Sequence, residues 1–235
     1  MPRSHTRLQA LALAALLASG FVTGCASTGD FTAGLDPVSS PEWTADMARF
    51  VAEDVATPPP ARPVVFTGSS SVRMWETLAT DFPDVAVLNR GFGGSQVRDA
   101  VWYADEIALR YKPRQIVLYA GDNDIAEGRS AAQVLADTQT FVARIRDTRP
   151  GIPIALLGIK PSPSRASLLG VQREANAALR DWAATQRNIA YIDVFNPMLD
   201  ADGMPREDLF IADRLHMNAA GYALWKGIVG SYLVR

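Results

Sequence analysis

The chain has 235 residues, of which 48% are hydrophobic and 20% charged, and its formal net charge is −2. This length and composition suit one globular domain with a substantial core, and they argue against disorder across the body of the chain. No excess of basic residues indicates a nucleic-acid partner.

The N-terminus has the pattern of an export signal. Arg3 and Arg7 precede an apolar stretch over residues 8–22, which is too short for a typical membrane-spanning helix of about 20 residues. The run Val-Thr-Gly-Cys that ends at Cys25 resembles the lipobox of bacterial lipoproteins, in which the cysteine is lipidated and becomes the mature N-terminus. We therefore predict a signal peptide over residues 1–24. The alternative is an ordinary cleaved signal in which the cysteine is incidental.

This interpretation places the protein in the cell envelope, anchored by lipid to a bacterial membrane on its periplasmic side or to the outer membrane. Removal of residues 1–24 would take away two arginines and no acidic residue, so the formal charge would fall to −4. It would also remove His5, which leaves His216 as the only histidine. Since Cys25 is the only cysteine, no thiol nucleophile, disulfide or cysteine-rich zinc site is expected in the mature domain.

The expected domain follows a tether. Residues 25–40 are rich in Gly, Ser, Thr and Asp and are typical of a flexible linker. An amphipathic helix is predicted over residues 41–55, and the proline run at 58–60 ends it. The predicted globular domain spans residues 41–235.

Strands and helices then alternate along the chain. The apolar runs that fit buried strands cover residues 64–67, 85–88, 115–119, 154–159 and 189–194. Helical patterns lie between them, at about residues 72–78, 97–108, 130–145, 165–186 and 218–233, and Ser130 with Gln133 forms a capping box at the start of the third. This alternation predicts an α/β fold, a three-layer α/β/α sandwich around a five-stranded parallel sheet.

Polar or glycine-rich turns follow four of the predicted strands. They are Gly68–Ser71, Asn89–Ser95, Gly121–Asp124 and Asp213–His216. Ligands of such sheets bind outside the carboxyl ends of the strands, so these turns are expected on one rim. Residues 160–165 follow the fourth strand on the same rim and are interpreted as a substrate-contacting loop.

These turns hold the groups that a serine hydrolase needs. A serine becomes a strong nucleophile only when a base takes its proton and a third group orients that base. His216 is the available base, and Asp213, three residues earlier, is close enough on a turn to reach its ring. The backbone N–H of Gly94 and the side-chain amide of Asn123 are suitable donors for an oxyanion.

The four turns resemble the sequence blocks of SGNH (GDSL-like) hydrolases, and the resemblance runs from about residue 64 to residue 221. It implies that Ser70 is the nucleophile and that Asp213 and His216 complete the catalytic triad. It also implies an oxyanion hole formed by the N–H groups of Ser70 and Gly94 and by the side chain of Asn123. One departure is Ser69, which stands where the GDSL motif has aspartate and leaves Ser69 or Ser71 as alternative nucleophiles.

The resemblance implies a serine esterase that hydrolyses carboxylic esters, with short acyl chains favoured, and that needs no metal or organic cofactor. A metal at Asp122 and Asp124, which flank Asn123, is the disfavoured alternative. An acyltransferase or deacetylase acting on envelope carbohydrate would use the same acyl-enzyme, so the motifs do not separate it from an esterase. A non-catalytic binding lipoprotein is the remaining alternative.

Overall fold

A computed structural model describes residues 1, 30–31 and 41–235, and the predicted signal peptide, Cys25 and most of the tether lie outside the described residues. Its centre is a parallel sheet in the order β2-β1-β3-β4-β5. The strands are β1 (Val64–Gly68), β2 (Val87–Gly91), β3 (Gln115–Tyr119), β4 (Ile154–Leu157) and β5 (Ile189–Ile192). The predicted five-stranded α/β/α fold is confirmed.

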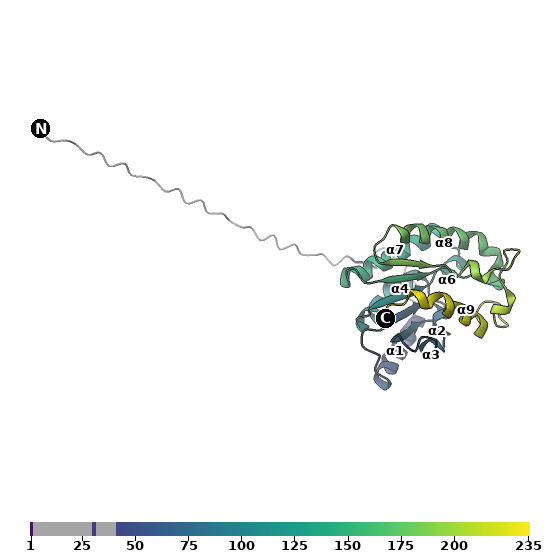
Figure 1. Ribbon diagram of the computed structural model, residues 1–235, viewed down its shortest axis with the longest axis horizontal. Coiled ribbons are helices and arrows are strands. Elements are labelled where there is room, and N and C mark those ends of the chain that lie inside the picture. The colour runs from purple at the N-terminus through teal and green to yellow at the C-terminus, as the bar shows by residue number, and fades with distance from the viewer. Residues whose placement is uncertain (2–29, 32–40) are drawn as a thin grey trace.

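Helices cover both faces of this sheet (Figure 1). On one face lie α1 (Pro41–Ala56), α4 (Val97–Trp102), α5 (Ala104–Ile107), α7 (Ala131–Thr148) and α8 (Leu169–Ala184). On the other face lie α2 (Ser70–Arg73), α3 (Leu78–Asp81) and α9 (Ala219–Val229). The short helix α6 (Asp122–Ala126) follows β3 directly, and the 3-10 turns are η1 (Leu109–Tyr111), η2 (Pro163–Leu168), η3 (Asn196–Met198), η4 (Glu207–Leu209) and η5 (Gly230–Tyr232).

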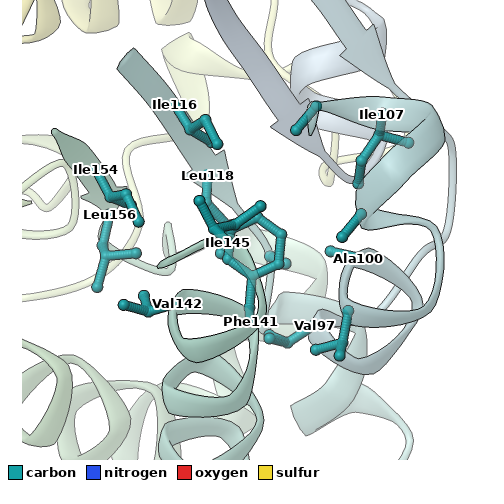
Figure 2. Packing of buried hydrophobic residues seen from close by; sticks show 14 of the residues in the cluster. Val97, Ala100, Ile107, Ile116, Leu118, Phe141, Val142, Ile145, Ile154 and Leu156 are labelled. Carbon is teal, nitrogen blue, oxygen red and sulfur yellow. The ribbon is translucent and has the colours of Figure 1, made fainter. Parts of the chain in front are cut away.

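Two apolar layers hold the sheet between the helices. Successive side chains of a strand point to opposite faces, so Val64 and Phe66 pack toward α2 and α9 while Val65 packs toward α4 and α7. Figure 2 shows the layer between the sheet and helices α4 and α7, where Phe141 and Ile145 of α7 lie against the strand side chains. Because the central strands are buried on both faces, their sequences are almost wholly apolar.

The helix boundaries differ from the prediction where a turn interrupts the apolar pattern. The helix expected over residues 72–78 is two short helices, α2 and α3, and the one expected over 97–108 breaks at Tyr103 into α4 and α5. The capping box at Ser130 is confirmed, since the Gln133 N–H donates to its Oγ and the Gln133 side chain accepts from the Ser130 N–H. Trp102, the last residue of α4, is 43% exposed.

The helix α1 runs along the sheet from one rim to the other. Near its start, the Trp43 ring contacts the Phe92 ring edge-on, with 5.5 Å between the centroids, just beyond the end of β2. Near its end, Asp54 accepts from the Tyr111 hydroxyl at 2.9 Å and pairs with Arg90. The chain therefore enters the sandwich beside the carboxyl ends of the strands.

The C-terminal segment is fastened to the opposite rim. The Gln115 side chain, at the start of β3, donates to the carbonyl of Tyr232 and accepts from the N–H of Val234, both at 2.8 Å. These two bonds place the end of the chain beside the amino ends of the strands. No helix among the described residues is long and apolar enough to cross a membrane.

Candidate active site

The loop that carries Ser70 depends on a glycine at the end of β1. Gly68 has φ +116°, and a Cβ at this position would lie 1.8 Å from the carbonyl oxygen of Tyr119 on the neighbouring strand. Only glycine allows both this conformation and this approach. The chain then turns sharply, the Ser69 N–H donates to that same carbonyl at 2.9 Å, and Ser70 becomes the first residue of α2.

Ser70 and His216 lie within hydrogen-bond distance, although 146 positions separate them in the sequence. The distance from Ser70 Oγ to His216 Nε2 is 2.9 Å, and that from His216 Nδ1 to Asp213 Oδ2 is 2.7 Å. A hydroxyl, an imidazole and a carboxylate thus form a continuous hydrogen-bonded chain. Geometrically, this arrangement lets the imidazole take a proton from the hydroxyl while the carboxylate fixes the ring.

The turn that carries His216 orients Asp213 through the backbone. The other carboxylate oxygen, Oδ1, accepts from the N–H groups of Leu215 and His216, both at 2.9 Å, and Arg214, which follows Asp213, has φ +59°. Burial acts to raise the pKa of Asp213, but hydrogen bonds from the His216 ring and from the two backbone N–H groups outweigh it and lower this pKa to about 2. The carboxylate of Asp213 is therefore ionised at neutral pH.

The two serines that flank Ser70 lie in a different environment from Ser70 itself. Ser69 and Ser71 are buried, whereas Ser70 is half-buried at the rim. Ser69 has non-helical backbone angles before α2, and its side chain makes no capping hydrogen bond to this helix. Of the three serines that the sequence left open, Ser70 is the one whose Oγ lies beside the imidazole.

The glycine-rich loop after β2 reaches the same rim. The registers pair Gly68 with Gly91 of β2 and with Tyr119 of β3, so the loops that follow these three strands start side by side. Gly94 has φ +81°, and Asn123 Nδ2 donates to the carbonyl of the next residue, Ser95, at 3.0 Å. Gly94 and Asn123, the two predicted oxyanion donors, therefore lie on loops that a hydrogen bond joins.

Asp124 also links the segment of Asn123 to the residues that follow the glycine-rich loop. It is buried, and its carboxylate accepts from the N–H of Val97, the first residue of α4, at 3.1 Å and 3.2 Å to its two oxygens. Burial raises the pKa of Asp124 to about 7, against the hydrogen bond from Val97.

Asp122 is the centre of a group of polar contacts that the sequence did not reveal. Its carboxylate contacts Lys160 Nζ at 3.3 Å, Arg165 Nη1 at 2.8 Å and Gln172 Nε2 at 3.3 Å. Lys160, which was interpreted as part of a substrate-contacting loop, is buried and also donates to the carbonyl of Leu215 at 2.9 Å. The position of Lys160 directly after a strand was the one signal in the sequence.

Asp122 and Asp124 thus point to different protein partners rather than to a common centre. Within the described part of the chain, no three His, Cys, Asp or Glu side chains are grouped so that they could hold a metal ion.

A comparison with protein families matches residues 31–224 to the GDSL-like lipase/acylhydrolase family. The chain belongs to this family. The match covers most of the sequence and includes Ser70, Gly94, Asn123, Asp213 and His216. Membership makes this GDSL-like protein a hydrolase of the esterase or lipase type.

Solved structures share the fold of this GDSL-like protein. A candidate acylhydrolase from Bacteroides fragilis superposes with a TM-score of 0.68 at 21% identity, covering 80% of this chain and 95% of that one. A GDSL-like lipase from Bacteroides thetaiotaomicron gives 0.67 at 18% identity, covering 80% and 97%. A carbohydrate esterase of family 3 from Talaromyces cellulolyticus gives 0.52 at 18% identity, covering 72% and 94%. A search of curated proteins finds no match.

Proposed function

We propose that this GDSL-like protein is a serine esterase that hydrolyses carboxylic esters through an acyl-enzyme on Ser70. The observation that supports this most strongly is the pair of distances along the chain of side chains, 2.9 Å from Ser70 to His216 and 2.7 Å from His216 to Asp213. Ser70 Oγ attacks the ester carbonyl while His216 Nε2 takes its proton. Asp213 holds the ring and stabilises the imidazolium that results.

The first half of the reaction ends when the alcohol departs. His216 gives its proton to the departing alkoxide, and the acyl group remains bound to Ser70. In the second half, water takes the place of the alcohol. A water molecule then attacks this acyl group, His216 takes the water's proton, and the acid is released as Ser70 regains its hydrogen. In both tetrahedral intermediates the oxyanion accepts from the backbone N–H groups of Ser70 and Gly94 and from Asn123 Nδ2.

The proposed base is open to solvent, as the hydrolytic step requires. The side chain of His216 is 21% exposed and that of Asp213 is 44% exposed, so bulk water reaches the base that would activate it. We further propose that the acyl chain is short, because polar side chains, those of His216, Asp213 and Asn123, lie on the rim around Ser70. A long alkyl chain gains nothing from such neighbours.

The test is the turnover of nitrophenyl esters from acetate to dodecanoate by the purified protein and by the Ser70→Ala variant. We expect turnover that declines with chain length, and a loss of at least about 10³-fold in kcat for the variant. Ser69→Ala, which removes the neighbouring hydroxyl, is the matched control and is expected to keep most of the activity. Equal rates for wild type and Ser70→Ala would exclude the assignment.

Two further measurements separate the rival functions. Added glycerol or a sugar acceptor would divert acyl groups from water to the alcohol if the enzyme were a transferase, and mass analysis of the products detects this. A fluorophosphonate probe labels an activated serine, so failure of Ser70 to react would indicate a protein that binds without catalysis.

We also propose that the mature protein is attached to the cell envelope by lipid on Cys25. The support lies in the sequence, namely the signal-like residues 1–24 and the single cysteine that follows them. Cys25→Ser is expected to move the protein from the membrane fraction to the soluble fraction and to abolish labelling by an alkyne fatty acid. Unchanged fractionation would contradict the anchor.

A further inference from the structure

Arg165 lies beside two consecutive residues, Asp122 and Asn123, and makes a polar contact with each of them. Its Nη1 is 2.8 Å from Asp122 Oδ2, and its Nη2 donates to Asn123 Oδ1 at 3.1 Å. The side chain is 18% exposed, so most of the guanidinium is enclosed by protein. A planar guanidinium can serve two acceptors at once in a fixed geometry, which the single ammonium of a lysine does less well.

The hydrogen bonds of the Asn123 side chain then determine its orientation. Its oxygen accepts from Arg165, and one N–H of its amide donates to the carbonyl of Ser95 at 3.0 Å. The reversed amide would place its NH₂ against the guanidinium and its oxygen against the carbonyl, two contacts without a hydrogen bond. With both ends assigned, one N–H remains for a ligand.

Asp122 holds the guanidinium in place and connects it to the loop of His216. The same carboxylate oxygen that contacts Arg165 also contacts Lys160 Nζ at 3.3 Å, and Lys160 donates to the carbonyl of Leu215, the residue before His216. The Ser164 N–H, next to Arg165, donates to the carbonyl of Arg214 at 3.0 Å. The loop over residues 160–165 therefore contacts both the oxyanion side and the base side of the site.

We propose that Arg165 is a positioning residue that fixes the amide of Asn123 so that its free N–H meets the oxyanion. This inference rests on the proposed esterase function, because it assigns a role at the same site. Arg165 acts through Asn123 and does not touch the substrate. Its permanent positive charge also polarises the amide, which strengthens the remaining N–H as a donor in the transition state.

The test compares Arg165→Met with the matched control Arg173→Met. Arg173 is an arginine of α8 whose Nη2 donates to the carbonyl of Gly203 at 3.1 Å, outside the set of contacts around Asp122. We expect Arg165→Met to lower kcat by about 10- to 100-fold with KM changed less than about threefold, since the lost contact matters mainly in the transition state. Arg173→Met should stay within about twofold of wild type.

A double-mutant cycle separates positioning from a merely structural role. In an Asn123→Ala background, Arg165→Met should change kcat by less than about twofold, because the group that it positions is already absent. An equal loss of kcat in both backgrounds would overturn the inference. So would a rise in KM at constant kcat, which would mean that the guanidinium binds the substrate directly.

A conservative variant keeps the test valid if Arg165→Met does not fold. Arg165→Lys retains a positive charge beside Asp122 and should fold, with a kcat between those of wild type and Arg165→Met. If Arg165→Lys matches wild type, the bridging geometry is unimportant and the inference fails. If wild type itself hydrolyses no ester, the proposed function fails instead, so the two failures are distinguishable.

Discussion

At the scale of single residues, the site is defined by how each polar atom is used. Both carboxylate oxygens of Asp213 are occupied, one by the imidazole and the other by two backbone N–H groups. One oxygen of Asp213 therefore orients the His216 ring, and the other stabilises the turn that carries it. The two roles can therefore be tested independently.

Asp213→Asn should separate them. The amide oxygen can still accept from the backbone N–H groups of Leu215 and His216, so the turn should persist. Its NH₂ group cannot accept from His216 Nδ1, and the ring would lose the partner that fixes its tautomer. We expect kcat for a nitrophenyl ester to fall on the order of 10²- to 10⁴-fold, with an unchanged circular dichroism spectrum. Retention of full activity would show that the carboxylate is dispensable.

The pH range of this contact follows from the direction of the shift. The pKa of Asp213 is about 2 in the folded protein and 3.8 in the unfolded chain, so its hydrogen bonds stabilise the fold fully above pH 4. That contribution is lost as the pH falls through 2.

At the scale of elements, the ends of the strands determine where the loops begin. The β1 strand ends at Gly68, where the backbones of β1 and β3 approach so closely that a side chain has no space. The loop of Ser70 starts from this contact. A change at Gly68 should therefore affect both the stability of the sheet and the position of Ser70.

Gly68→Ala is expected to destabilise the protein by about 3 kcal/mol or more, because it combines a left-handed backbone with a clash against Tyr119. Gly227→Ala is the control, since Gly227 lies in α9 and a Cβ there would meet nothing within 4 Å. That change should stabilise by about 0.5–1 kcal/mol. Urea denaturation midpoints measure both. Similar midpoints for the two variants would contradict the argument from close approach.

The contact between α6 and α4 predicts a dependence of stability on pH. Because burial raises the pKa of Asp124 to about 7, from 3.8 in the unfolded chain, the folded state holds this proton more tightly. The contribution of Asp124 to stability therefore decreases as the pH rises from about 4 to 7, and it is constant above that range.

Asp124→Asn removes this proton and retains an acceptor for the Val97 N–H. The wild type should lose stability relative to the variant between pH 4 and pH 7, as measured by urea midpoints at several pH values. Parallel pH profiles for the two proteins would show that Asp124 carries no such proton.

At the scale of the whole molecule, the sequence predicted what depends on local pattern. Gln115–Tyr119 was bounded correctly because β3 lies in the centre of the sheet and is buried on both faces. The edge strand β2 was predicted too early, since it continues past its apolar residues into Asn89 and Arg90. These polar residues are tolerated because tertiary partners satisfy them: Asn89 donates to the carbonyl of Val72, and Arg90 pairs with α1.

The candidate site likewise has a part that the sequence predicted and a part that it did not. The side chains of the predicted motif were selected by residue type and by their place in the turns, and the structure brings Ser70, Asp213 and His216 together. The role of Arg165 was not predictable, because a single arginine in a proline-rich loop has no pattern that reveals its partners. Its contacts with Asp122 and Asn123 arise only when β3 and β4 lie side by side.

The beginning of α1 and the C-terminal segment lie at opposite rims of the sheet, and this has a practical consequence. Residue 235 follows the segment fastened to Gln115, about five residues of strand, or roughly 16 Å, from the rim that bears Ser70. Trp43, by contrast, lies beside the glycine loop, since a Cβ on Gly94 would be 3.2 Å from its ring. Immobilising the enzyme on a bead through Arg235 should leave the reaction face open to dissolved esters, whereas a bulky fusion at the beginning of α1 would obstruct it.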